Sequence, residues 1–224
     1  MSSALLPDRP LVEALVRSTL FRQLGQDAPA TPAPILVVNS SARHMHISPE
    51  NLEILFGAGG KLTVHKWLYQ EGQFASEQTV TLIGPRRRVI PNLRILGPCR
   101  NLTQVELAIT DAIQLGVDLP VRMSGDIKGT PGGYVMGPKG MLEMKDGLIR
   151  AARHVHMSPA DAKFYAVKHL DRITLKVTSP GCNTRFDDLI VRVDPSFKLE
   201  VHIDTDEANA CDLERATKVE LSKH

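Results

Sequence analysis

The sequence predicts a mainly β protein made of two similar small β-barrel domains with short capping helices, preceded by an N-terminal amphipathic helix. Two observations support this prediction: a histidine motif that occurs twice, and many short apolar runs separated by turn residues. The 224 residues include 16 glycines and 15 prolines, which indicates many turns between short segments rather than a bundle of long helices. Aromatic residues make up only 4% of the chain, so we expect aliphatic cores.

Composition and charge exclude several classes of protein. With 27 basic and 25 acidic side chains the net charge is +2, so the chain lacks the broad basic field that nucleic-acid binding requires. Its apolar runs stay well short of the roughly 20 residues of a membrane-spanning helix. The three cysteines, Cys99, Cys182 and Cys211, form no C-x-x-C pair and fit a reducing, cytosolic compartment. We therefore expect neither nucleic acid nor a membrane as a partner.

Residues 1–33 form a separate N-terminal segment. From Pro10 to Leu24 apolar residues recur with helical spacing, while charged residues such as Arg9 and Glu13 fall on another face, which predicts a short amphipathic helix. The proline-rich stretch QDAPATPAP follows and predicts a semi-stiff linker. From the residues alone three interpretations stay open: a first helix packed on the core, a secretion signal, or a docking helix.

The body of the chain contains an internal repeat. Residues 43–51 read RHMHISPEN and residues 153–161 read RHVHMSPAD. Each copy follows an apolar run, at 35–38 and at 148–149, and ends in a Ser-Pro pair, which is typical of an N-cap and first helical position. The repeat therefore predicts that each histidine pair lies at the exit of a strand, directly before a short helix.

A weaker repeat and several further strands complete the predicted domains. The segments QVELAITDA (104–112) and EVHIDTDEA (200–208) each read as an alternating strand followed by a capped helix, with Glu106 opposite His202. Other short strands are predicted at 79–84, 92–97, 133–137, 141–144, 173–177 and 189–193.

The repeated histidines carry the predicted chemistry. Residues i and i+2 of a strand face the same side, so both imidazoles of an H-x-H pair can chelate one metal ion. The weaker repeat supplies a third ligand to each pair. We therefore predict two sites with three ligands each: His44, His46 and Glu106 in the first, and His154, His156 and His202 in the second. Three ligands leave a fourth position open, which favours catalysis over a structural role; zinc suits these ligands, as do Co²⁺, Mn²⁺ and Fe²⁺.

Two dications held by five neutral imidazoles and one carboxylate would leave a positive pocket, which implies an anionic substrate. Arg100 lies at a strand end, six residues before Glu106, and its guanidinium could bind phosphate in a bidentate manner; a solvated turn arginine is the alternative. Arg43 and Arg153 should point away from the histidine faces. The glycine-rich segment 124–134 could present N–H groups to a phosphate, but a long hairpin loop is the favoured interpretation.

Several segments together resemble one enzyme family. They are NSSARHMHISPENLEILFG, EGQFASEQTVTLIGP, LGPCRNLTQVELAITDA, VRMSGDIKGTPG, AARHVHMSP and LEVHIDTDEANA. From about Ile35 to Leu221 the chain closely resembles the phosphate propanoyltransferases of the PduL type, the metal-dependent phosphotransacylases of bacterial microcompartments. The resemblance implies transfer of a short acyl group, typically propanoyl, between coenzyme A and inorganic phosphate, so that acyl-CoA and phosphate give acyl phosphate and coenzyme A.

The resemblance also implies an architecture and a set of site residues. The implied domains are 1–33, an encapsulation helix and linker; 47–152, a first β-barrel; and 34–46 together with 153–224, a second β-barrel, with a two-zinc site between the barrels. The six ligands named above and Arg100 as the phosphate-binding residue match the motifs of the family. The matching coenzyme A positions are Ser41, Lys66, Arg94, Ser124, His202 and Asn209.

The implied partners and location follow from the same family. Residues 1–33 would bind shell proteins and place the enzyme in the lumen of a bacterial microcompartment within the cytoplasm, which favours the docking interpretation of the helix. A homo-oligomer, a dimer or larger, is implied as well. Two other classes stay open: a dimetal hydrolase that activates water with the same ligands, and a scaffold module with closed metal sites and no turnover.

Overall fold

The structure is a computed structural model that describes Val16 and residues 33–223. The predicted N-terminal helix and its linker therefore lie almost wholly outside the described residues. The chain divides into two units, residues 1–34 and residues 35–224, and the fold reported below is that of the second unit. In the described part of the chain, no helix is long and apolar enough to cross a membrane.

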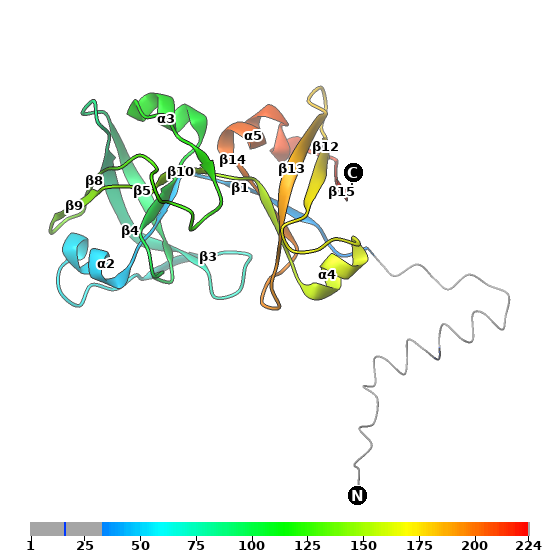
Figure 1. Ribbon diagram of the computed structural model, residues 1–224, viewed down its shortest axis with the longest axis horizontal. Helices are drawn as coiled ribbons and strands as arrows, with labels where there is room; N and C mark the ends of the chain where they lie inside the picture. Colours follow the sequence, from blue (N-terminus) through cyan, green and yellow to red (C-terminus); the bar gives the residue numbers. More distant parts are fainter. Residues whose placement is uncertain (1–15, 17–32, 224) are drawn as a thin grey trace, which may run out of the picture. The chain divides into compact units, whose positions relative to one another are not determined.

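The first curled sheet is built mainly from the N-terminal half of this unit and contains nine strands in the order β7-β10-β6-β2-β5-β4-β8-β9, with β3 paired to β4 (Figure 1). Its strands are β2 (His44–His46), β3 (Val64–Trp67), β4 (Phe74–Ile83), β5 (Val89–Gly97), β6 (Gln104–Glu106), β7 (Val121–Arg122), β8 (Gly133–Met136), β9 (Met141–Met144) and β10 (Leu148–Ala151). Two short helices belong to this half, α2 (Pro49–Phe56) and α3 (Ile109–Leu115).

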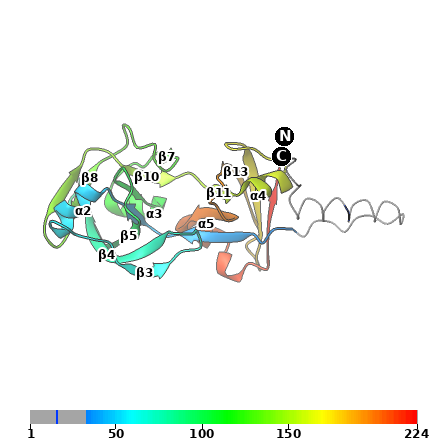
Figure 2. The same cartoon turned by 90° about the horizontal axis from the view of Figure 1, so that it is seen from below.

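The second curled sheet has six strands in the order β1-β14-β11-β13-β12-β15, seen from another side in Figure 2. Its strands are β1 (Val37–Ser41), β11 (His154–Met157), β12 (Arg172–Thr178), β13 (Thr184–Val193), β14 (Glu200–Asp204) and β15 (Lys218–Ser222). The short helices α4 (Pro159–Phe164), α5 (Thr205–Ala210) and η1 (Leu213–Arg215) accompany it. The prediction of a mainly β chain with few short helices is confirmed, with two curled half-barrel sheets.

Each sheet has its own aliphatic core, as the composition predicts. Met45, Leu82 and Ile95 are fully buried in the first cluster, and Val155 and Leu175 in the second. Along β11 the buried Val155 and Met157 alternate with the half-buried His154 and His156, because successive side chains point to opposite faces of a sheet. Each core therefore fixes which residues of the histidine strands face away from it.

The two halves of the unit pair their histidine strands in the same register. In β2 and β6, His44 lies opposite Glu106; in β11 and β14, His154 lies opposite His202. The neighbouring connections match as well, because β10 runs parallel to β6 and β1 runs parallel to β14. From β1 the chain enters β2 of the other sheet, and from β10 it enters β11. The chain thus crosses between the sheets at equivalent points.

One expected boundary differs from the structure. The resemblance implies that 34–46 lies with the C-terminal half, and β1 within this range does pair with β14. The strand His44–His46, however, pairs with β5 and β6 of the other sheet. The crossing falls at Ala42 and Arg43, because the first histidine pair uses Glu106 of the first sheet as its cross-strand neighbour.

The predicted helix starts are confirmed. Ser48 caps α2 by accepting a hydrogen bond from the Asn51 N–H, and Ser158 caps α4 by accepting one from the Asp161 N–H. Each cap satisfies a backbone donor that would otherwise have no partner at the helix start. The caps end each histidine strand abruptly, so that both histidine pairs lie at strand exits.

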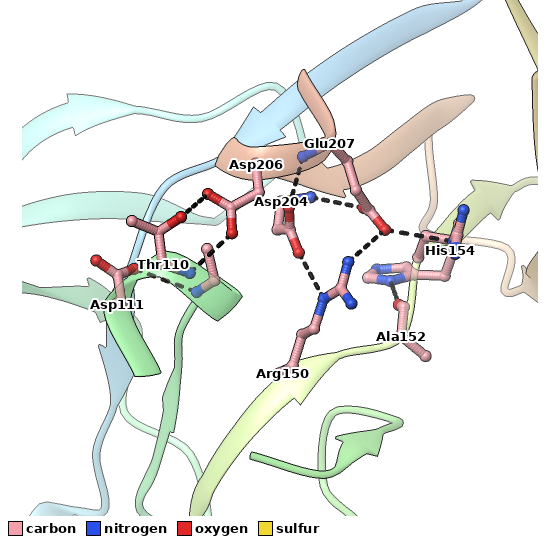
Figure 3. Close-up of polar contacts among 10 residues, drawn as sticks. Thr110, Asp111, Arg150, Ala152, His154, Asp204, Asp206 and Glu207 are labelled. Atoms are coloured by element: carbon pink, nitrogen blue, oxygen red, sulfur yellow. Dashed lines mark hydrogen bonds and ion pairs between the residues drawn. The ribbon is translucent and has the colours of Figure 1, made fainter. Parts of the chain in front are cut away.

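Polar contacts join the two sheets next to the histidine strands (Figure 3). The Thr110 hydroxyl of α3 donates to Asp206 of α5 at 2.6 Å, and Arg150 of β10 donates to Asp204 at 2.7 Å and to Glu207 at 2.9 Å. Asp204 is the last residue of β14, the strand that carries His202, so its contact with Arg150 holds this strand against the N-terminal half.

Candidate metal centre

The first cluster of possible metal ligands lies on two neighbouring strands. His44 and His46 project from one face of β2, and Glu106 of β6 lies opposite His44. The Nε2 atoms of the two histidines are 3.2 Å apart, and Glu106 oxygens lie 3.5 Å from His44 Nε2 and 3.8 Å from His46 Nε2. All three side chains are buried. The predicted set is therefore brought together at a single point.

The second cluster has the same construction. His154 and His156 project from β11, and His202 of β14 lies opposite His154. One nitrogen of each ring lies within 4.8 Å of the others, and the imidazoles of His154 and His202 stack with centroids 4.9 Å apart. These residues are half-buried. The structure thus also brings together the second predicted set.

A backbone carbonyl orients the first histidine of each pair. The Nδ1 atom of His44 lies 2.8 Å from the carbonyl oxygen of Ala42, and Nδ1 of His154 lies 2.9 Å from that of Ala152. A carbonyl oxygen only accepts, so Nδ1 carries the hydrogen and donates it. Nε2 then keeps its lone pair and faces the cluster, which is the arrangement that prepares an imidazole for a metal.

The donor atoms fit divalent ions. Two imidazole nitrogens only 3.2 Å apart suit a shared ion at roughly 2.0–2.1 Å from each. Among the described residues, His46 Nδ1 and both ring nitrogens of His156 are buried without a hydrogen-bond partner. A buried polar atom without a partner is costly, and for His156 a metal ion in the second cluster would supply the missing partner.

The protonation states also suit a cation. Burial lowers the pKa of His46 well below its usual range, lowers that of His154 to about 4 and that of His156 to about 2. These imidazoles are therefore neutral near pH 7, as metal ligands must be. Burial alone would raise the pKa of Glu106, but His44 and His46 hold it at about 2, so this carboxylate is ionised.

The arginines that precede the histidine pairs each contact an acidic side chain of a helix, and Arg43 also belongs to the cavity lining. Arg43 Nη1 donates to Asp111 at 2.8 Å, and Arg153 Nε lies 3.4 Å from Glu207. Asp111 and Glu207 occupy the third position of α3 and α5. Each arginine thus fixes the helix that follows the strand of the third candidate ligand.

Both clusters open into one cavity of about 710 Å³. Its lining includes all six candidate ligands together with Arg100, Ser41, Arg94 and Ser124. Arg100 Nη1 lies 3.5 Å from Ser124 Oγ, and burial lowers the pKa of its guanidinium. Its position in the lining favours the anion-binding interpretation of Arg100 over that of a solvated turn residue.

Two residues of the implied coenzyme A set lie outside this lining. Lys66 is exposed on β3, opposite Ala75 of β4, and Asn209 is exposed in α5. Neither belongs to the residues that line the cavity.

Three polar residues of the cavity region were missed by the reasoning from sequence. Gln104 donates to Glu106 Oε1 at 2.6 Å, and Glu200 Oε2 lies 3.1 Å from His202 Nε2. Both stand two residues before a candidate ligand in the weaker repeat, and that spacing could have revealed them. Arg192 lines the cavity because β13 places it opposite His156, which no local pattern indicates.

A cavity that gathers five histidines, three glutamates and several arginines indicates an enzyme. Comparison with known proteins gives the family. A family model described as phosphate propanoyltransferase matches residues 37–214. A phosphate propanoyltransferase of Planctopirus limnophila is 56% identical over 95% of this chain and 90% of its own length. The protein of that name from Thermotoga maritima is 51% identical over 79% of this chain and 84% of its own length. The one from Salmonella typhimurium is 43% identical over 91% of this chain and 92% of its own length. The chain therefore belongs to the phosphate propanoyltransferase family, a family of acyl-transferring enzymes.

Proposed function

We propose that this enzyme transfers a short acyl group, propanoyl in the first place, between coenzyme A and inorganic phosphate at a centre that holds two zinc ions. The observation that carries the proposal is the single cavity, in which both ligand clusters and Arg100 face the same space. Family membership supports the acyl transfer, and the anion-binding side chains support phosphate as the acceptor.

Different side chains of this enzyme would bind the metal ions and the phosphate. His44, His46 and Glu106 would hold one ion, and His154, His156 and His202 the other. When bound, two dications supply positive charge for phosphate and for the oxygen of the reacting carbonyl. Arg100 would fix the phosphate through its planar guanidinium. The phosphate oxygen attacks the thioester carbon, a C–O bond forms, the C–S bond breaks, and coenzyme A leaves as the thiolate.

The implied coenzyme A contacts fall into two groups. Ser41, Arg94 and Ser124 line the cavity and would contact the part of coenzyme A near the thioester. Arg94 donates to the Ser76 carbonyl at 2.5 Å, which holds its guanidinium in place. Lys66 and Asn209 would contact more distant parts, because both are exposed outside the cavity.

A phosphate-dependence assay tests this function. Thiol release from propanoyl-CoA should require inorganic phosphate, and acyl phosphate should accumulate in equal amount. A dimetal hydrolase would release thiol at the same rate without phosphate, and a scaffold module would release none. Either result would replace the proposed activity.

Replacing Arg100 by alanine should impair the use of phosphate more than the use of coenzyme A. A charge-assisted contact with an anion contributes about 1.5–3 kcal/mol, so the KM for phosphate should rise about 10- to 100-fold. Arg100→Lys should restore little, because an ammonium cannot form the bidentate contact.

The control for Arg100 is Arg172→Ala, which removes an exposed arginine of β12 that pairs with Asp188 of β13 in the other sheet. Initial rates at varied phosphate and acyl-CoA measure both KM values. If Arg100→Ala and Arg172→Ala have the same KM for phosphate, Arg100 does not bind it.

We also propose that residues 1–33 direct the enzyme into a bacterial microcompartment by binding shell proteins, and that the enzyme is a homo-oligomer. The match to the family model begins at residue 37, so this segment lies outside the matched part of the chain. An amphipathic helix with a linker suits binding to a partner surface.

Deleting residues 1–33 should leave catalytic constants within about twofold and abolish packaging, because every proposed site residue lies after the linker. A fluorescent protein carrying residues 1–33 should collect in shells, and diffuse fluorescence in shell-forming cells would contradict the targeting role. The deletion should also reduce concentration-dependent self-association, since it removes the apolar residues that the sequence predicts on one face of a helix; size-exclusion chromatography of both forms measures this.

A further inference from the structure

The two ligand clusters differ in charge. The first contains the carboxylate of Glu106, whereas the second consists of three histidines. Imidazole binds a metal in its neutral form and supplies no negative charge. The three histidines of the second cluster would therefore leave the positive charge of a bound dication unneutralised, close to the dication of the first cluster.

Glu200 lies beside the second cluster and is almost completely buried, with 2% of its surface exposed. Its Oε2 is 3.1 Å from His202 Nε2 and accepts a hydrogen bond from the Gln70 amide at 2.6 Å. The His202 ring and the Glu200 carboxylate therefore face each other in a close polar contact.

The equivalent residue of the first half is neutral. Glu200 stands opposite His156, and Gln104 stands opposite His46. The Gln104 amide donates to Glu106 at 2.6 Å. On β6 of the first half, Gln104 is followed two residues later by the ligand Glu106. At the equivalent positions on β14 of the second half, Glu200 is followed by the ligand His202. The two halves exchange the position of their carboxylate and keep one each.

A buried carboxylate needs positive charge nearby. Ionised side chains are costly to bury unless they are paired. Within the described part of the chain, no arginine or lysine forms an ion pair with Glu200, whose recorded polar contacts are with Gln70, His202 and Asn39. A cation in the second cluster would provide the missing charge.

We propose that Glu200 supplies the negative charge of the second metal site and stabilises the ion through its contact with His202. It is a positioning residue, because its oxygens do not belong to the group of ligand atoms within 4.8 Å of one another. This inference rests on the metal centre of the proposed function, and it gives each of the two sites one carboxylate.

Zinc binding tests the proposal directly. Purified protein is equilibrated with buffers of fixed free Zn²⁺, and the metal content per chain is measured. A His44→Ala background disables the first site, so that the second can be titrated alone. In this background Glu200→Gln should raise the free Zn²⁺ concentration for half-loading about 10- to 100-fold, the usual effect of removing a carboxylate behind a ligand.

A matched control separates charge from folding. Glu207 is another buried glutamate of the same half, but it pairs with Arg150 and Arg153 rather than with a candidate ligand. Glu207→Gln should leave zinc affinity within about twofold, and circular dichroism should show the same fold for all variants.

If the wild-type chain binds two ions and Glu200→Gln leaves the zinc affinity of the second site unchanged, this inference is overturned and the metal centre stays intact. Equal losses in Glu200→Gln and Glu207→Gln would also overturn it, because a structural effect would then explain both. A wild-type chain that binds no zinc would overturn the metal centre together with the inference.

Discussion

Removal of divalent metal should reduce phosphate-dependent acyl transfer to the background rate, and added zinc should restore it. In both clusters a backbone carbonyl orients an imidazole for metal binding, and both ring nitrogens of His156 are buried without a hydrogen-bond partner in the described part of the chain. We expect about two ions per chain in the active enzyme, removable by a chelator. Elemental analysis paired with the thiol-release assay measures both quantities.

A histidine outside the clusters provides the control for the metal experiment. His65 lies on β3 with its side chain 50% exposed and contacts Glu77. His65→Ala should keep both ions and the full rate, whereas His44→Ala should lose an ion and most activity. Full activity in protein shown to be free of metal would contradict the metal centre.

Much of the site could be predicted because the chain repeats its own motifs. The pair of H-x-H motifs and the weaker match between 104–112 and 200–208 named all six candidate ligands. The structure brings those ligands together for a local reason: in both halves the third ligand is the cross-strand neighbour of the first histidine. Ser48 and Ser158 could likewise be predicted as caps, because N-capping depends on a few adjacent residues.

Long-range pairing could not be predicted in the same way. The strand of His44 joins the first sheet through β5 and β6, and no residue near Ala42 marks the point where the chain crosses. Arg192 faces the cavity because of its register with β11, and this register depends on strands distant in sequence. Gln104 and Glu200 were within reach of the repeat, but only contacts with Glu106 and His202 reveal their importance.

Direct attack by phosphate forms no covalent acyl-enzyme, so no cysteine should be needed for activity. Cys99 is the thiol nearest in sequence to Arg100, and an acyl-cysteine would be reasonable chemistry for a thioester substrate. The Cys99 side chain packs against the core of the first sheet and does not belong to the lining of the cavity. Burial raises the pKa of its thiol, which lowers the fraction of the nucleophilic thiolate.

Cys99→Ala should therefore keep most of the wild-type activity, with kcat within about threefold, because direct attack by phosphate needs no protein nucleophile. The activity of His154→Ala should fall to less than about 1% of wild type. Losing a metal ligand should reduce activity more than losing the hydrogen-bond partner of a ligand, which typically has a 10- to 100-fold effect. Both substitutions remove a partly buried polar side chain, so thermal unfolding of the two variants controls for stability.

Steady-state kinetics distinguish the two routes. Direct attack requires phosphate and acyl-CoA to be bound together, so double-reciprocal plots at varied concentrations of both should intersect. An acyl-cysteine route would release coenzyme A before phosphate reacts and give parallel lines, the pattern of ping-pong kinetics. Parallel lines, together with an acyl group trapped on Cys99 and detected by mass spectrometry, would overturn the direct mechanism, and the histidine clusters would then support an acyl-enzyme instead of orienting phosphate.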